Sequence, residues 1–149
     1  MSYVFTDKVK STAHIESVTL TEEITAGQFV TLGKLNPDGE SRSATKAKTM
    51  EEADAFVVPD PISYNDTHFD YGAYVVKPGE TVRAYVFERG DYYSVTTDLV
   101  TGGAKPGDAL TIGDNGLGFK KADSGRGIAQ LVNEEAHGFA GTVEVISFR

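Results

Sequence analysis

The feature that most constrains this chain is a glycine turn followed at once by a β-prone run, a pattern that recurs along the sequence. In residues 105–116 (KPGDALTIGDNG), Pro106-Gly107 predicts a reversal, because proline fixes one backbone angle and glycine accepts a positive one. A short apolar run follows, and Asn115-Gly116 is the dipeptide most typical of a tight hairpin. Residues 26–33 repeat the pattern with two glycines and a threonine in register, and residues 78–85 repeat it more loosely. The chain is therefore predicted to fold from short strands joined by tight turns.

Strand signals continue through the rest of the chain. The runs expected to be strands are residues 15–20, 29–35, 41–46, 55–58, 82–87, 92–96, 109–112, 117–121, 128–132 and 141–148. Short strands separated by glycine and proline turns indicate an all-β fold, a compact antiparallel β-barrel or β-sandwich. A helix is plausible only in residues 49–55, because Thr49 and Glu52 have capping-box spacing there. We expect at most one short helix, and a long loop near residues 59–73.

A length of 149 residues suits a single domain with its own core. We expect residues 14–149 to form one β-rich domain and residues 1–13 to form an N-terminal arm. Tyr3, Val4 and Phe5 are an apolar cluster in this otherwise polar arm. Such a cluster either packs onto the domain or docks on a partner.

Composition excludes several classes of protein. The chain has no cysteine, which rules out disulfides, thiolate zinc sites and cysteine nucleophiles. No apolar run approaches the roughly 18–20 residues that span a bilayer, and the N-terminal residues lack the apolar middle of a secretory signal. We therefore expect a protein made in the cytoplasm that has no membrane partner. A net charge of −8 argues against nucleic acid as a partner, because phosphate binding needs a concentrated basic surface.

The charges are unevenly distributed. Residues 34–48 are mainly basic, and residues 51–76 contain six acidic residues but no lysine or arginine. Two such segments can pair neighbouring subunits or match a complementary partner surface. They can equally be ordinary solvated loops, which is the more common meaning of charge clusters of this size.

No residue pattern selects a catalytic centre or a cofactor site, so we expect a protein that is not an enzyme. Asp66, His68 and Asp70 stand at alternate positions, which on a strand would place three metal ligands on one face. Loop residues of these types more often hydrogen-bond their own turns, and no second ligand pair accompanies them. His14 and His137 stand apart from any recognisable base and nucleophile.

Two further motifs are better explained by turns. Arg89-Gly90-Asp91 spells a cell-adhesion tripeptide, but it joins two β-prone runs where a Gly-Asp turn is needed in any case. Gly113, Gly116 and Gly118 do not have dinucleotide-binding spacing, and no helix pattern follows them. We interpret these glycines as positions fixed by backbone geometry.

The aromatic residues leave a ligand-binding alternative open. Side chains that would form a flat carbohydrate platform are Tyr64, Phe69, Tyr71, Tyr92 and Tyr93. In an all-β domain such residues are more often cross-strand pairs and core.

The order of the β elements resembles that of head decoration (capsid cement) proteins of tailed bacteriophages. The segments that carry the resemblance are residues 55–58 (AFVV), 74–85 (YVVKPGETVRAY), 90–91 (GD), 105–110 (KPGDAL) and 128–132 (IAQLV). Residues 26–30 (AGQFV) are similar to the start of the first core strand of that family. The resemblance covers residues 24–148.

This resemblance implies a non-enzymatic β-rich protein that binds the outer face of an assembled capsid and stabilises it. The implied partner is the major capsid protein, the implied state is a homo-oligomer with a trimer favoured, and the implied location is the capsid exterior, after synthesis in the host cytoplasm. Capsid contacts in the family are often made by an N-terminal arm, which here gives as candidates Tyr3, Val4, Phe5, Lys8 and Lys10. The candidates for contacts between subunits are Lys46, Lys48, Tyr64, Phe69 and Tyr71. The alternative is a carbohydrate- or ligand-binding β-module, for example an adhesion domain on the virion surface.

Overall fold

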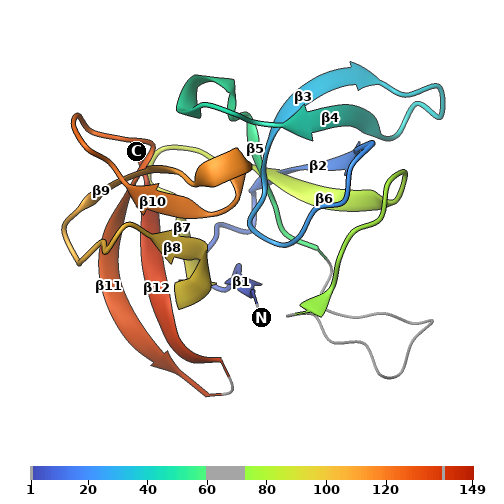
Figure 1. Ribbon diagram of the computed structural model, residues 1–149. Helices are drawn as coiled ribbons and strands as arrows, with labels where there is room; N and C mark the ends of the chain where they lie inside the picture. The colour runs from blue at the N-terminus through green and yellow to red at the C-terminus, as the bar shows by residue number, and fades with distance from the viewer. Residues whose placement is uncertain (1, 60–72, 139) are drawn as a thin grey trace.

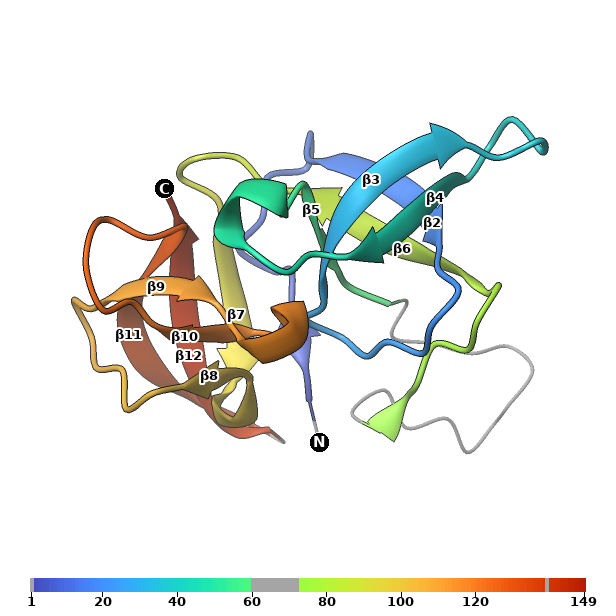
Figure 2. The ribbon, with the colours of Figure 1, turned by 45° about the horizontal axis from the view of Figure 1, so that its top comes forward.

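The computed structural model describes residues 2–59, 73–138 and 140–149, and it is all-β, as predicted (Figure 1). Five strands close into a barrel in the order β2 (His14–Thr19), β4 (Arg42–Lys46), β3 (Phe29–Leu35), β5 (Ala55–Val57) and β6 (Thr81–Val86). Seven strands form a sheet in the order β1 (Val4–Phe5), β7 (Tyr92–Thr96), β12 (Gly141–Phe148), β11 (Ala129–His137), β9 (Ala109–Ile112), β10 (Phe119–Lys121) and β8 (Val100–Thr101). Figures 1 and 2 show the barrel and the sheet side by side, with the β3–β4 hairpin projecting from the barrel.

Strand pairing is antiparallel with two exceptions among the described strands. β2 pairs with β4, and β8 with β10, in parallel. The parallel β2–β4 pair closes the barrel, and both strands that end the seven-stranded sheet, β1 and β8, are two residues long. The predicted antiparallel pairing holds for the other strand pairs of the described chain.

The recurring sequence pattern corresponds to one recurring turn. Gly27, Gly79 and Gly107 have φ values of 90°, 83° and 97°, as the third residue of a type II turn requires. A fourth turn of this kind holds Gly90, with φ of 94°, inside the Arg89-Gly90-Asp91 tripeptide. The strands β3, β6, β7 and β9 each begin two residues after one of these glycines. The turns thus start strands of both the barrel and the sheet.

In three of these turns an acidic residue follows the glycine and locks the turn. The carboxylates of Glu80, Asp91 and Asp108 accept hydrogen bonds from the backbone N–H three residues earlier, at 3.1, 2.8 and 2.9 Å. The bond from the Lys105 N–H is the main reason that the pKa of Asp108 lies below its usual value. The sequence pattern predicted the glycine turns but not this function of the acidic residue.

Side-chain alternation divides the apolar residues between two cores. On β3 and β5, Phe29 and Phe56 face the sheet, whereas the adjacent Val30 and Val57 face the barrel interior. The barrel is filled by small aliphatic side chains, namely Val18, Leu20, Ile24, Val30, Ala44, Ala55, Val57, Val76, Val82 and Ala84. The second core, which we call the shared core, lies between barrel and sheet and is aromatic. In it the rings of Phe29 and Phe119 meet edge to face, with centroids 5.3 Å apart.

The predicted helix is a single 3₁₀ turn at Met50–Glu52 (η1). The expected capping box does not form, because Thr49 makes no side-chain cap and Glu52 instead accepts a hydrogen bond from the Lys48 N–H at 3.1 Å. Two other 3₁₀ turns are Thr97–Leu99 (η3) and Asp114–Gly116 (η4). The long loop expected near residues 59–73 falls almost wholly outside the described residues.

The loop between β9 and β10, residues 113–118, joins the sheet to the barrel, and we call it the junction loop. Gly118 donates a backbone hydrogen bond to the Gly27 carbonyl at 2.8 Å, and the Gln28 side-chain amide donates to the Asn115 carbonyl at 2.9 Å. Gly118 has φ of 63°, and a Cβ there would lie 2.3 Å from the Leu99 carbonyl oxygen. The interpretation of Gly113, Gly116 and Gly118 as positions fixed by backbone geometry is confirmed.

Replacing Gly118 with alanine is predicted to destabilise the fold by roughly 3 kcal/mol or more, because the backbone of Leu99 or of the junction loop must move. The matched control is Gly79→Ala, where φ is also positive, at 83°, but nothing lies within 4 Å of the added Cβ. That variant should lose about 1–2 kcal/mol. Urea unfolding of both variants checks the difference, and equal losses would show that the close approach at Gly118 is unimportant.

Candidate functional site

The segment that carries the capsid-contact candidates, residues 2–13, lies against the seven-stranded sheet, and we call it the N-terminal strap. β1 pairs with β7 so that Val4 lies opposite Val95 and Phe5 opposite Ser94. The Tyr3 N–H donates to Thr96 Oγ1 at 3.0 Å, and the Thr96 N–H donates to the Tyr3 carbonyl at 3.0 Å. Val4 is 3% exposed and belongs to the shared core. Its side chain is therefore packed within its own chain.

The other candidates of the strap lie at its surface. Phe5 stacks on His137 of β11 with ring centroids 4.2 Å apart, and Tyr3 stacks on Phe5 at 5.8 Å. Lys8 pairs with Glu135, and Lys10 pairs with Glu88, each at 3.3 Å. Surface ion pairs of this kind contribute little to stability, typically below about 1 kcal/mol. Half-buried rings beside exposed ammonium groups give the strap a surface of mixed aromatic and cationic chemistry.

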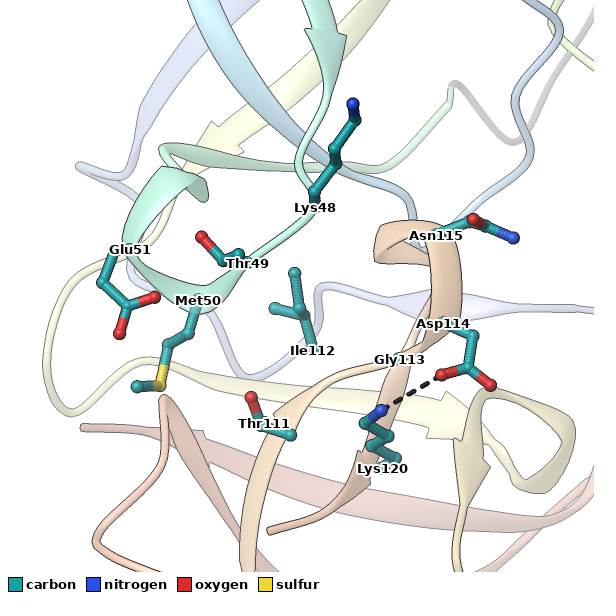
Figure 3. A pocket seen from close by; sticks show the side chains of 10 residues that line it. All are labelled: Lys48, Thr49, Met50, Glu51, Thr111, Ile112, Gly113, Asp114, Asn115 and Lys120. Atoms are coloured by element: carbon teal, nitrogen blue, oxygen red, sulfur yellow. Dashed lines mark hydrogen bonds and ion pairs between the residues drawn. The ribbon is translucent and has the colours of Figure 1, made fainter.

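Lys46 and Lys48, two of the subunit-contact candidates, line an open groove between barrel and sheet. One part of the groove has a volume of about 780 Å³ and is lined by Glu22, Thr31, Thr45, Lys46, Lys48, Glu52 and Asn115. It continues past Lys48 and Asn115 into a hollow of about 570 Å³ between the η1 turn and the β9–β10 hairpin (Figure 3). We call both parts together the junction groove.

The junction groove has a polar lining. Lys120 forms an ion pair with Asp114 at 3.1 Å on one side of the groove (Figure 3). Within the part of the chain that the structure describes, Lys46 and Lys48 make no ion pair. The residues that line the groove include no aromatic ring. Its chemistry suits hydrogen bonds and ion pairs with a protein surface better than stacking on a sugar.

The sequence suggested Lys46 and Lys48 as candidates for subunit contacts, but it did not suggest the other residues that line the groove. Thr31, Asn115 and Lys120 reach the groove from strands and a loop far apart in the chain. No local pattern marks them, because the groove exists only after barrel and sheet pack together. The remaining subunit-contact candidates, Tyr64, Phe69 and Tyr71, lie outside the described residues.

The candidate ligand residues fall in separate places. Asp66, His68 and Asp70 lie outside the described residues, and the rest of the chain holds no group of three possible metal ligands. His14 Nε2 lies 3.0 Å from Glu16 Oε1, and His137 lies in the stack with Phe5. These two histidines are therefore on different units of the fold, His14 on the barrel and His137 on the sheet.

The proposed aromatic platform is not formed by its two described members. Tyr93 is fully buried in the shared core, and this burial is the main reason that the pKa of its hydroxyl is raised. The adjacent Tyr92 points to the opposite face of the sheet and is 40% exposed. A flat stacking surface needs both rings on one side.

The Arg89-Gly90-Asp91 tripeptide is confirmed as a turn. Asp91 is 5% exposed, and its carboxylate accepts the Glu88 N–H at 2.8 Å. The Asp91 carbonyl also accepts the Phe148 N–H at 2.9 Å. A receptor that recognises this tripeptide needs the aspartate carboxylate, which here is occupied inside the protein.

Asp91→Ala is predicted to destabilise the protein by roughly 1–2 kcal/mol, because it leaves the Glu88 N–H without its acceptor. Arg89→Ala, in the exposed half of the same turn, should change stability by less than about 0.5 kcal/mol. Thermal or urea unfolding distinguishes the two. A neutral Asp91→Ala would contradict the structural function of the carboxylate.

No family model and no curated protein matches this sequence. The fold, in contrast, is shared with a structural component of a bacteriophage head. The matching structure is the N base of head fiber gp8.5 of bacteriophage phi29, with a TM-score of 0.55, 13% sequence identity, and coverage of 100% of this chain and 95% of that chain. The expected resemblance to phage head proteins is confirmed at the level of the fold. Within the described residues, no helix is both long and apolar enough to cross a membrane.

Proposed function

We propose that this protein is a non-enzymatic structural component of a phage virion that binds the outer surface of the assembled capsid and stabilises it. The observation that carries the proposal is the shared fold: barrel and sheet together match a head fiber base over the whole chain. The family resemblance noted in the sequence supports the same assignment. The protein partner is then the major capsid protein.

Stabilisation would follow from linkage. A protein that binds the assembled shell and not its separated subunits shifts the equilibrium toward the shell, and many copies add their effects. The net charge of −8 suits an outward-facing coat, because it keeps decorated particles soluble and mutually repelling.

The N-terminal strap is the proposed capsid-contact surface. Tyr3 and Phe5 offer half-buried aromatic rings, and Lys8 and Lys10 offer charges that are held only by surface ion pairs. Aromatic rings commonly anchor protein interfaces, while exposed charges tune the rate of association. Val4 is withdrawn from this surface because it is buried in its own chain.

Mixing the purified protein with shells of the major capsid protein and sedimenting them should bring the protein down with the shells. The Lys8→Glu, Lys10→Glu double variant should bind at least about tenfold more weakly, through loss of two cationic contacts. The control is Lys77→Glu, a charge reversal at an exposed lysine in a turn of the barrel. Absence of wild-type binding at micromolar concentration would overturn the function, whereas equal binding by all three proteins would overturn the strap as the contact.

The junction groove is the proposed contact between subunits of a homo-oligomer, with a trimer favoured. Lys46 and Lys48 lie in it without ion pairs to described residues, so an acidic segment of a second copy would find free charges there.

Light scattering after size exclusion should give the mass of an oligomer for the wild type and a smaller mass for the Lys46→Glu, Lys48→Glu variant. Lys34→Glu, on the exposed part of β3, is the matched control and should keep the wild-type mass. A monomeric wild type at all concentrations, both free and on shells, would refute the subunit contact.

A further inference from the structure

The β11–β12 pair places two glutamates directly opposite each other. Glu134 on β11 is the register partner of Glu144 on β12. β12 lies inside the sheet, with β7 on its other side, and Glu144 is only 6% exposed. Like charges directly opposite each other destabilise a sheet, and a buried carboxylate also loses its hydration. Glu134 itself is exposed to solvent, so Glu144 is the member of the pair whose charge needs compensation.

The neighbours of Glu144 on its own face are mostly apolar. Side chains alternate along β12, so Glu144 shares its face with Ile146 of the shared core. In the same row across the sheet, β7 presents Val95 and β1 presents Val4. β11 presents Glu134, the charged group directly opposite.

Two other acidic groups on neighbouring elements, Asp98 and Glu135, have partners of their own. The η3 turn packs against β12 and carries Asp98, whose carboxylate accepts the Ser2 hydroxyl. The ion pair of Lys8 and Glu135 lies on the opposite face of the sheet. Within the residues that the structure describes, Glu144 makes no ion pair.

One oxygen of the buried Glu144 carboxyl lacks a hydrogen-bond donor. Glu144 Oε2 is buried and receives a hydrogen bond from no donor among the described residues. The side chain directly opposite Glu144 in the strand register is another carboxyl, that of Glu134. Two ionised carboxylates have no donor between them, whereas one added proton turns one of them into a donor for the other. Burial first, and then the charge of Glu134, raise the pKa of Glu144.

We propose that Glu134 and Glu144 form a proton-binding site, in which the two carboxyl groups share one proton across the β11–β12 pair. The same hairpin holds the N-terminal strap, through the stack of His137 on Phe5 and the ion pair of Glu135 with Lys8. Filling the site draws the two strands together. Emptying it leaves two repelling carboxylates beside the strap.

The direction of the pH effect follows from the proton count. A carboxyl whose pKa is raised in the folded protein keeps its proton to a higher pH than in the unfolded chain. At pH values around and above the ordinary glutamate pKa of 4.5, the folded state binds more protons than the unfolded chain does. The free energy of unfolding therefore falls as pH rises. The site would exist whether or not the protein binds a capsid, because its groups belong to one chain.

The test compares thermal unfolding of the full-length wild type with that of Glu144→Gln between about pH 4.5 and about pH 8. Glutamine imitates the protonated carboxyl, so the two proteins should melt together at the acidic end. At the alkaline end the variant should melt at least about 3 °C higher. The control is Glu40→Gln, an exposed carboxyl in the turn between β3 and β4, whose difference from the wild type should not grow with pH.

Glu134→Gln serves as a second variant, because it removes the opposing charge and keeps Glu144. It should reduce the pH dependence of the melting temperature even if Glu144→Gln fails to fold. In the wild type, exchange of the Thr96 amide, which is bonded to Tyr3, should quicken beyond its intrinsic pH dependence as the site empties. A gap between wild type and Glu144→Gln that does not change with pH would overturn the proposal. So would a rise in wild-type melting temperature on adding Mg²⁺ or Ca²⁺ at about pH 8 that Glu144→Gln lacks, because a metal ion would then hold the pair.

Discussion

The aromatic contact between barrel and sheet is the interaction on which the rest of this structure depends. The rings of Phe29 on β3 and Phe56 on β5 point out of the barrel toward the sheet. There they contact the rings of Phe119, Tyr93 and Phe148. The buried residues of the barrel core are small aliphatic side chains. Because neighbouring residues on one strand serve different cores, a shift of one position would exchange the two sets. The register of β3 and β5 is therefore fixed from both sides.

Polar turns and the junction loop position the strands that make this aromatic contact. Type II turns start β3, β6, β7 and β9, and three of them are locked by a carboxylate that accepts the first N–H of the turn. The junction loop then ties the two units together through glycine backbone and the buried side chain of Gln28. Rigid turns at the start of the strands leave few ways to assemble the two sheets, which favours a single native arrangement. The surfaces proposed for binding, strap and groove, are built on this frame.

Local patterns in the sequence predicted what is local in the structure. The glycine turns, most strands and the absence of a long helix in the described chain follow from turn chemistry and short apolar runs. The choice between barrel and sandwich, the parallel pairs and the junction groove could not be predicted, because they depend on contacts between segments far apart in the chain. The predicted capping box does not form, because the Glu52 carboxylate accepts a hydrogen bond from the Lys48 N–H instead. Glu144 gave no signal either, since alternation with Val143 and Val145 is typical of a solvent-facing position. Here both faces of β12 are covered.

The two short strands that end the seven-stranded sheet affect how copies of this protein can meet one another. Long, flat edge strands recruit further strands from neighbouring molecules and lead to aggregation. β1 and β8 are each two residues long, and the other sheet closes on itself. The two strands that end the sheet therefore offer only short rows of backbone groups to another copy. At these two ends, contacts between copies are left mainly to side chains, which can be selective where backbone pairing cannot.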